Sequence, residues 1–232
     1  MAYVVGTGRL LAGDVEGAAA ALHLVEARLS GADHVRRALA QVELARGDLE
    51  SASRWVHSEG DNRLDRVLAA KLAWRRGDRE EAVRRAAAEL MTSVEPDEHP
   101  WDVAGTAFQL GQIFADAGEL DDAVLTVGVM TRLLEGAPED LPLLTHLQLL
   151  VAAITRLQGR PDEAVENLRR LRPRMGGTDL AECLREEARC EIALGGLDEA
   201  TALYRASVET FEAAGEKWEA RETRDEADRP SA

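Results

Sequence analysis

Histidine and cysteine are the side chains that most often bind metals or act as nucleophiles, and this chain has five histidines and two cysteines. The two cysteines, Cys183 and Cys190, lie on one predicted helix, about 10 Å apart along its axis, too far for a disulfide. We expect two small buried thiols in a reducing compartment. The histidines fall in different helices or loops without H-x3-H or E-x2-H spacing, so no metal site is expected: they are His23, His34, His57, His99 and His146.

Acidic pairs recur along the chain and could suggest acid–base catalysis; examples are Glu80–Glu81, Asp121–Asp122 and Asp162–Glu163. They occupy the same place in successive repeats, the start of a helix, where the helix dipole favours negative charge. The basic run LRRLRPR, 168–174, closes a helix with favourable cations. Phosphate binding by this run is an alternative, and its arginines are Arg169, Arg170, Arg172 and Arg174.

No other group of residues specifies an enzyme. The glycine-rich stretch VGTGRLLAG, 5–13, has no strand before it and no GK[ST] after it, so it does not predict a phosphate loop. The sequence indicates no set of polar residues that would converge to form an active site. We therefore expect no enzymatic activity, no cofactor and no metal.

Charge and hydropathy narrow the class of partner. The formal net charge is −15 at pH 7, which repels a polyanion and argues against direct nucleic-acid binding. The chain opens without a basic-then-apolar leader and contains no run of 18 apolar residues, so no membrane association is expected. A cytoplasmic protein is the default expectation.

A six-residue pattern organises the whole sequence. It begins with Gly, ends with Ala, and separates two apolar stretches of helical period, such as VLAAKLAWRR and AVRRAAAEL around GDREEA. Self-similarity at a period of 20–50 residues is typical of helical repeat arrays. The six copies are GDVEGA (13–18), GDLESA (47–52), GDREEA (77–82), GELDDA (118–123), GRPDEA (159–164) and GGLDEA (195–200).

Each position of the pattern has a physical role. Gly ends the first helix in a left-handed conformation. The acids at the fourth and fifth positions fall in the first turn of the second helix. The Ala packs at the closest approach of the two helices. We expect the following alanines to be buried: Ala82, Ala123, Ala164 and Ala200.

These signals predict an all-α solenoid of about six helix-turn-helix repeats, with twelve or thirteen helices and no sheet. The segments TSVEPDEHP, 92–100, and RPRMGGTD, 172–179, are expected to be loops between repeats. Residues 1–214 would form the repeat domain, and residues 215–232 a capping helix of about ten residues followed by a frayed acidic tail.

The chain resembles the tetratricopeptide repeat family. Leu110, Gly111, Phe114 and Ala123 stand at the spacing of its L-G-x2-Y…A signature, and the last repeat supplies Ala200 and Tyr204 in the A-x3-F arrangement. The signature Trp is replaced by Ala107, Val127 stands at the second aromatic position, and the closing Pro is missing. The uneven steps between copies resemble the degenerate arrays of bacterial regulatory proteins.

This resemblance implies a right-handed superhelix whose concave groove is lined by the first helix of each repeat and binds a peptide or partner protein. The family register makes that groove locally basic, with three large apolar side chains, and we expect it to bind an acidic, partly hydrophobic segment. The Asn of the family's carboxylate clamp is absent. The residues placed in the groove are Arg37, Gln41, Lys71, Trp74, Arg75, Phe108, Gln112, His146, Leu149, Arg156, Arg185 and Arg189.

Two alternatives stay open. The groove arginines could pair with acids of neighbouring helices, leaving the groove empty or filled by the chain's own tail. The leading function is a protein-interaction module, an adaptor or regulatory scaffold. Alternatives are the sensor part of a transcriptional activator system, whose DNA-binding domain would lie outside this sequence, and a helical enzyme.

Overall fold

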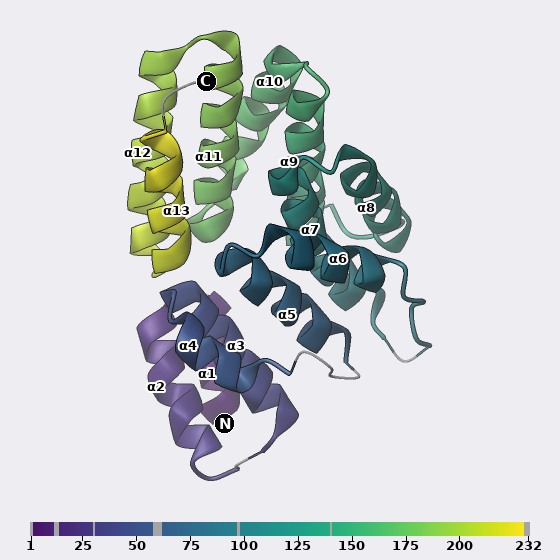
Figure 1. Cartoon of the computed structure of the whole chain (residues 1–232), viewed down its shortest axis with the longest axis vertical. Coiled ribbons are helices and arrows are strands. Elements are labelled where there is room, and N and C mark those ends of the chain that lie inside the picture. The colour runs from purple at the N-terminus through teal and green to yellow at the C-terminus, as the bar shows by residue number, and fades with distance from the viewer. Residues whose placement is uncertain are drawn as a thin grey trace. The chain divides into compact units, whose positions relative to one another are not determined.

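The computed structural model describes residues 2–11, 14–29, 31–57, 62–96, 98–139 and 141–229. Within these ranges the chain forms thirteen α-helices and one short 3-10 helix, and no strand, as the sequence predicts. The helices form two compact units (Figure 1). Unit 1 combines the two ends of the chain, Met1–His57 and Arg172–Ala232, and unit 2 is the stretch Ser58–Leu171.

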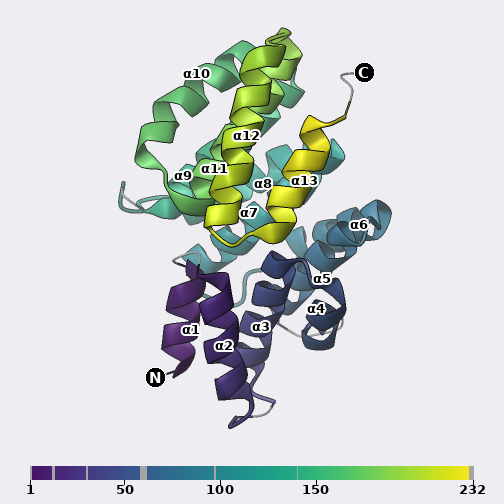
Figure 2. The same cartoon turned by 90° about the vertical axis from the view of Figure 1, so that its left-hand side faces the viewer.

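Unit 1 contains four helices from the first segment and three from the last. In both views α11 and α12 lie side by side as a hairpin, with α13 against α12 (Figures 1 and 2). The elements are α1 (Ala2–Leu11), α2 (Val15–Glu26), α3 (Asp33–Arg46), α4 (Leu49–Trp55), η1 (Arg172–Arg174), α11 (Gly177–Leu194), α12 (Leu197–Ala213) and α13 (Lys217–Ala227).

Unit 2 is a run of three helix pairs. The first helices of successive pairs are neighbours, because α7 contacts both α5 and α9. The elements are α5 (Arg63–Arg75), α6 (Arg79–Leu90), α7 (Pro100–Ala117), α8 (Leu120–Leu133), α9 (Pro142–Leu157) and α10 (Pro161–Leu171).

The six-residue pattern builds the turn inside each pair. Gly47 and Gly118 adopt φ of 76° and 79°, a left-handed conformation that closes α3 and α7 without a Cβ clash. The next residue donates its backbone N–H to the carbonyl five residues earlier, as Asp48 does to Glu43 at 3.0 Å. The same bond forms in the turns at Asp78, Glu119, Arg160 and Gly196. The first copy begins at Gly13, which lies outside the described residues.

The second position of the pattern adds a cap that sequence reasoning overlooked. Asp14, Asp48 and Asp78 each accept a hydrogen bond from the backbone N–H three residues later. A side-chain acceptor at this position stabilises a helix start by about 0.5–2 kcal/mol relative to Ala. The acids of the pattern therefore work both as caps and as first-turn charges, as at Glu80 and Glu81 of α6.

The last position is a close contact in every copy. Ala82, Ala123, Ala164 and Ala200 have no exposed surface, which confirms their predicted burial. The core around them uses few large side chains, among which Phe114, Leu150 and Leu168 are almost fully buried. Small residues let the two helices of a pair approach closely while keeping the interior filled.

The structure shows a seventh copy of the turn, GEKWEA at 215–220, between α12 and α13. Gly215 has φ of 77°, Glu216 N–H donates to the carbonyl of Phe211 at 2.9 Å, and Ala220 is 2% exposed. The expected capping helix is thus joined to α12 by the same device that joins the two helices of a pair. Its spacing of Gly to Ala was visible in the sequence, but it follows the sixth copy after only half a repeat.

The loop before α7 is held down by a buried arginine. Arg63 donates to both carboxylate oxygens of Glu98, at 2.9 and 3.1 Å, and to the carbonyl of Ser93 at 3.1 Å. Its remaining nitrogen binds Glu89 at 2.7 Å, and Glu98 also accepts the backbone N–H of Glu95. The hydrogen bond from Arg63 lowers the pKa of Glu98.

Candidate partner-binding surface

The predicted groove residues of unit 2 lie on three adjacent first helices, which we call the α5–α7–α9 face. None of them is fully exposed: some are buried, and the others are half-buried. The structure therefore places them on neighbouring elements, at positions between core and surface. They are Lys71, Trp74 and Arg75 on α5, Phe108 and Gln112 on α7, and His146, Leu149 and Arg156 on α9.

Phe108 and His146 form the best-defined contact of this face. Their rings are stacked, with centroids 4.4 Å apart and an angle of 7° between the planes. Leu149 lies on the same helix as His146, three residues later, so it falls near the same side of α9. The register predicts both residues in the groove, and in the structure they are in contact although almost forty residues, roughly one repeat, separate them in the sequence.

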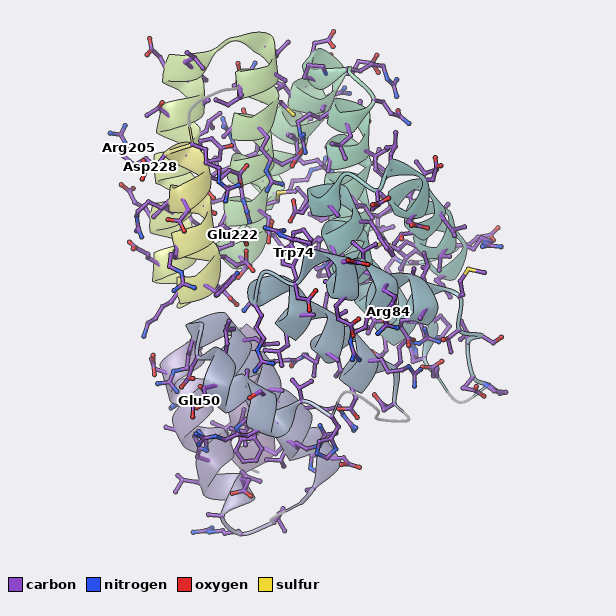
Figure 3. The ribbon with its side chains drawn as sticks, viewed as in Figure 1. Glu50, Trp74, Arg84, Arg205, Glu222 and Asp228 are labelled. Carbon is purple, nitrogen blue, oxygen red and sulfur yellow. The ribbon has the colours of Figure 1, made fainter. Side chains whose placement is uncertain are left out.

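Trp74 is less available than the sequence suggests. The residue is 8% exposed, and the guanidinium carbon of Arg79 lies 3.5 Å from the ring centroid (Trp74 is labelled in Figure 3). Such a cation–π contact contributes about 0.5–1 kcal/mol at an exposed site. A partner that stacks on this face of Trp74 must first displace Arg79.

An open cavity of about 590 Å³ lies beside this pair, between the turn ends of two repeats. Its charges are mixed, and Val83 and Ala117 supply the apolar part of its wall. Because acids and bases share the lining, the cavity does not select one sign of ligand. It is lined by Trp74, Arg79, Glu80, Val83, Arg84, Asp116, Ala117 and Glu119.

The remaining predicted residues belong to unit 1. Arg37 and Gln41 are half-buried on α3, and Arg185 and Arg189 lie on α11. Trp55 packs at the edge of the core cluster of α2 and α3. Arg36 of α3 donates to the carbonyl of Trp55, the last residue of α4, at 2.6 Å.

Arg185 and Arg189 bind the chain's own last helix. Arg185, which is 5% exposed, donates to Glu226 at 2.9 Å and to Glu219 at 3.2 Å. Arg189 donates to both oxygens of Glu226, at 2.6 and 3.0 Å. Here the two arginines pair with acids of a neighbouring helix, as in the alternative in which the groove arginines are used within the chain. Reversing both charges should consequently destabilise unit 1.

The cluster has a definite electrostatic state. Burial disfavours the ionised form of Glu226, but the charges of Arg189 and Arg185 outweigh it and hold its pKa well below the usual range. Tyr204 donates its hydroxyl to Glu226 at 2.9 Å. Burial and the neighbouring carboxylate raise the pKa of Tyr204, so it stays a neutral donor.

The described residues contain no group of three or more His, Cys, Asp or Glu side chains that could hold a metal ion. Both cysteines are buried thiols outside any disulfide, and burial, with the charge of Glu187, raises the pKa of Cys183 to about 12. Such a thiol is protonated at neutral pH and is a poor nucleophile. No helix in the part of the chain that the structure describes is long and apolar enough to cross a membrane.

Comparison with known proteins gives a likeness of fold. No protein-family model matches the sequence, and no curated protein matches it. Among solved structures, the chain is similar to RapI in its apo form, with a TM-score of 0.61 and 12% identity over 92% of this chain. It spans 65% of the length of RapI. It is also similar to the C-terminal part of a TPR repeat-containing protein from Cytophaga hutchinsonii, with a TM-score of 0.39 and 13% identity, covering 93% of this chain and 81% of that one.

These observations define the class as an all-α helical-repeat protein. The turns, the buried alanines and the likeness to RapI agree on this point. The repeats have the helix-turn-helix geometry that the sequence predicts, and they pack closely: a Cβ on Gly111 would come within 2.5 Å of Leu150. At this level of identity the likeness to RapI concerns the fold alone.

Proposed function

We propose that the protein is a protein-interaction module, an adaptor or regulatory scaffold, and that the α5–α7–α9 face binds a segment of another protein. Repeat arrays bury a continuous core and leave an extended surface, which suits peptide or protein recognition better than small-molecule chemistry. The observation that carries the proposal is the Phe108–His146 stack, because it joins two adjacent first helices on the face the register predicts.

The charges of this face suggest the chemistry of the partner. Lys71 of α5 and Arg156 of α9 are basic and half-buried, while α9 carries no acidic residue along its whole length. In a chain with a net charge of −15, a locally basic surface favours an acidic segment. Leu149 and the Phe108–His146 stack would contribute apolar contact, so the expected segment is acidic and partly hydrophobic.

A phage library of random twelve-residue peptides, selected on the full chain, tests this proposal without a known partner. We expect the enriched peptides to combine Asp or Glu with Leu or aromatic residues. The double variant Lys71→Glu/Gln112→Glu should weaken their binding by about tenfold or more, since about 1.4 kcal/mol corresponds to a factor of ten. Both side chains are half-buried, so the change spares the core.

Arg205→Glu is the matched control, because Arg205 is exposed on α12 (labelled in Figure 3) and the substitution adds the same kind of charge. The control should bind the selected peptides as the unmodified chain does. Enrichment of basic peptides, or equal binding by the double variant, would place recognition on another surface. We assign the protein to the cytoplasm as part of this proposal, in keeping with two buried cysteines that form no disulfide.

A further inference from the structure

Helix α13 presents a stripe of carboxylates to unit 1. Glu219, Glu222 and Glu226 are spaced i, i+3 and i+7, so they share one side of the helix. All three reach Arg185, with N–O distances of 3.2, 3.8 and 2.9 Å. The stripe thus converges on Arg185 of α11, and Glu226 also binds Arg189.

The receiving surface is preorganised for an acid. Arg185 is 5% exposed, and Arg189 is held in place by Glu186 at 3.1 Å on its own helix. Tyr204 of α12 adds a hydroxyl donor to the same carboxylate that binds both arginines. Two guanidinium groups and a phenol that converge on one carboxylate form a charge-assisted site, which we call the Arg185–Arg189 site.

The apolar part of the α13 contact is small. Ala220 and Thr223 are the buried residues of the helix, and the Thr223 hydroxyl is buried without a hydrogen-bond partner. An unsatisfied buried hydroxyl costs free energy. A helix of 11 residues with few apolar contacts has little stability of its own. Its position therefore depends strongly on the ion pairs.

The start of α13 is also tied to the first segment of unit 1. Lys217 binds Glu16 of α2 at 2.6 Å, and the side chain of Trp218 lies beside Gly47 at the end of α3. Gly215, in its left-handed turn, connects the helix to α12. One helix consequently links the two chain segments that make up unit 1.

We propose that the Arg185–Arg189 site is a docking site for an acidic helix of another protein, with carboxylates spaced i, i+3 and i+7, and that α13 is its internal occupant. The inference rests on the proposed interaction function but concerns a different surface. A partner helix displaces α13 by offering the same carboxylates to the arginines. When α13 leaves, the ion pair between Lys217 and Glu16 of the first segment breaks as well. The partner is an acidic amphipathic helix, because α13, the helix that occupies the site in this chain, is itself one.

Competition with a tethered helix has a measurable consequence. The tether gives α13 an effective concentration on the order of millimolar, which weakens the apparent affinity of any competitor. Removing the charges of α13 should therefore open the site. The variant Glu219→Gln/Glu222→Gln/Glu226→Gln keeps the shape of the helix and removes its ionic contacts.

The probe is a labelled peptide of residues 215–229, constrained as a helix by a hydrocarbon link between positions 221 and 225, which are exposed. We expect it to bind the triple Gln variant at least about tenfold more tightly than the unmodified chain. Adding Arg185→Glu and Arg189→Glu to the triple variant should abolish binding. The control Glu166→Gln/Glu199→Gln/Glu209→Gln changes three exposed glutamates and should leave binding unchanged.

A second measurement covers the case in which the triple variant does not fold. Amide hydrogen exchange of the unmodified chain is followed as the constrained peptide is added to millimolar concentration. We expect residues 217–227 to exchange several-fold faster as the peptide takes their place. Thr223→Val, which removes the unpaired hydroxyl, should strengthen α13 docking and weaken peptide binding.

Equal peptide affinity for the triple variant and the unmodified chain, or exchange in α13 that does not respond to the peptide, would overturn the inference. These results are separable from those of the phage selection. Peptides that bind the α5–α7–α9 face should be indifferent to the triple Gln variant, so either proposal can fail while the other holds.

Discussion

Replacing Gly111 by Ala tests how closely the repeats pack. Gly111 lies on α7, facing both its pair partner α8 and the next first helix, α9. A Cβ at this position would stand 2.5 Å from Leu150 Cδ2 and 3.1 Å from Thr126 Cγ2. Leu150 is 2% exposed, so its methyl groups cannot turn toward solvent to make room.

Two opposing terms set the size of the effect. Ala is favoured over Gly inside a helix by about 1 kcal/mol, whereas overpacking a filled core costs about 1–3 kcal/mol. Gly128 on α8 provides the matched control, because a Cβ there meets nothing within 4 Å. Gly128→Ala should therefore stabilise the protein by about 0.5–1 kcal/mol, and Gly111→Ala should be less stable than this control by about 1–3 kcal/mol.

Urea denaturation followed by circular dichroism at 222 nm measures both variants against the unmodified chain. The helix-propensity term is common to the two substitutions, so the difference between their unfolding free energies isolates the packing term. If Gly111→Ala stabilises the chain as much as Gly128→Ala does, the close approach of α7, α8 and α9 is refuted.

Three further predictions concern the turn and the ion pairs. Ala123→Leu should lower the free energy of unfolding by about 1–3 kcal/mol, because Ala123 has no exposed surface; an unchanged urea midpoint would contradict it. Glu226 has a folded pKa well below its unfolded value of about 4.3, so its stabilisation is complete above about pH 5 and declines progressively as pH falls below about 4 toward the folded pKa. Thermal melts of Glu226→Gln between pH 7 and 3 should accordingly show a shallower acid dependence than the unmodified chain, and parallel curves would argue against the cluster. Glu98→Gln should speed amide exchange at Glu95, whose N–H it binds at 2.8 Å, and unchanged exchange would mean that the loop is held by other contacts.

The fold was largely readable from the sequence because one local device is repeated. A Gly that must adopt a left-handed conformation, acids in the next helical turn and a buried Ala are local requirements, and six residues suffice to reveal them. The repeat that contains GELDDA added the spacing of Leu110, Gly111 and Phe114, all of which are buried in the structure.

The candidate site was only partly readable. The repeat register was enough to predict that Phe108 and His146 lie near each other, because the first helices of successive repeats are neighbours. The contacts of Arg185 and Trp74 were not readable in the same way. Arg185 binds Glu226, which lies 41 residues later in the sequence on another helix, and Arg79 covers the ring of Trp74. Such pairings depend on how helices pack in three dimensions, which periodicity does not specify.

Photo-crosslinking tests the central claim most directly. A benzophenone amino acid replaces Gln112 on the α5–α7–α9 face in one variant and Arg205 on α12 in another, and each is irradiated with the most strongly enriched phage peptide. The account predicts an adduct at position 112 and none at position 205. An adduct at 205, or no adduct at 112 at a peptide concentration that saturates binding, would contradict it.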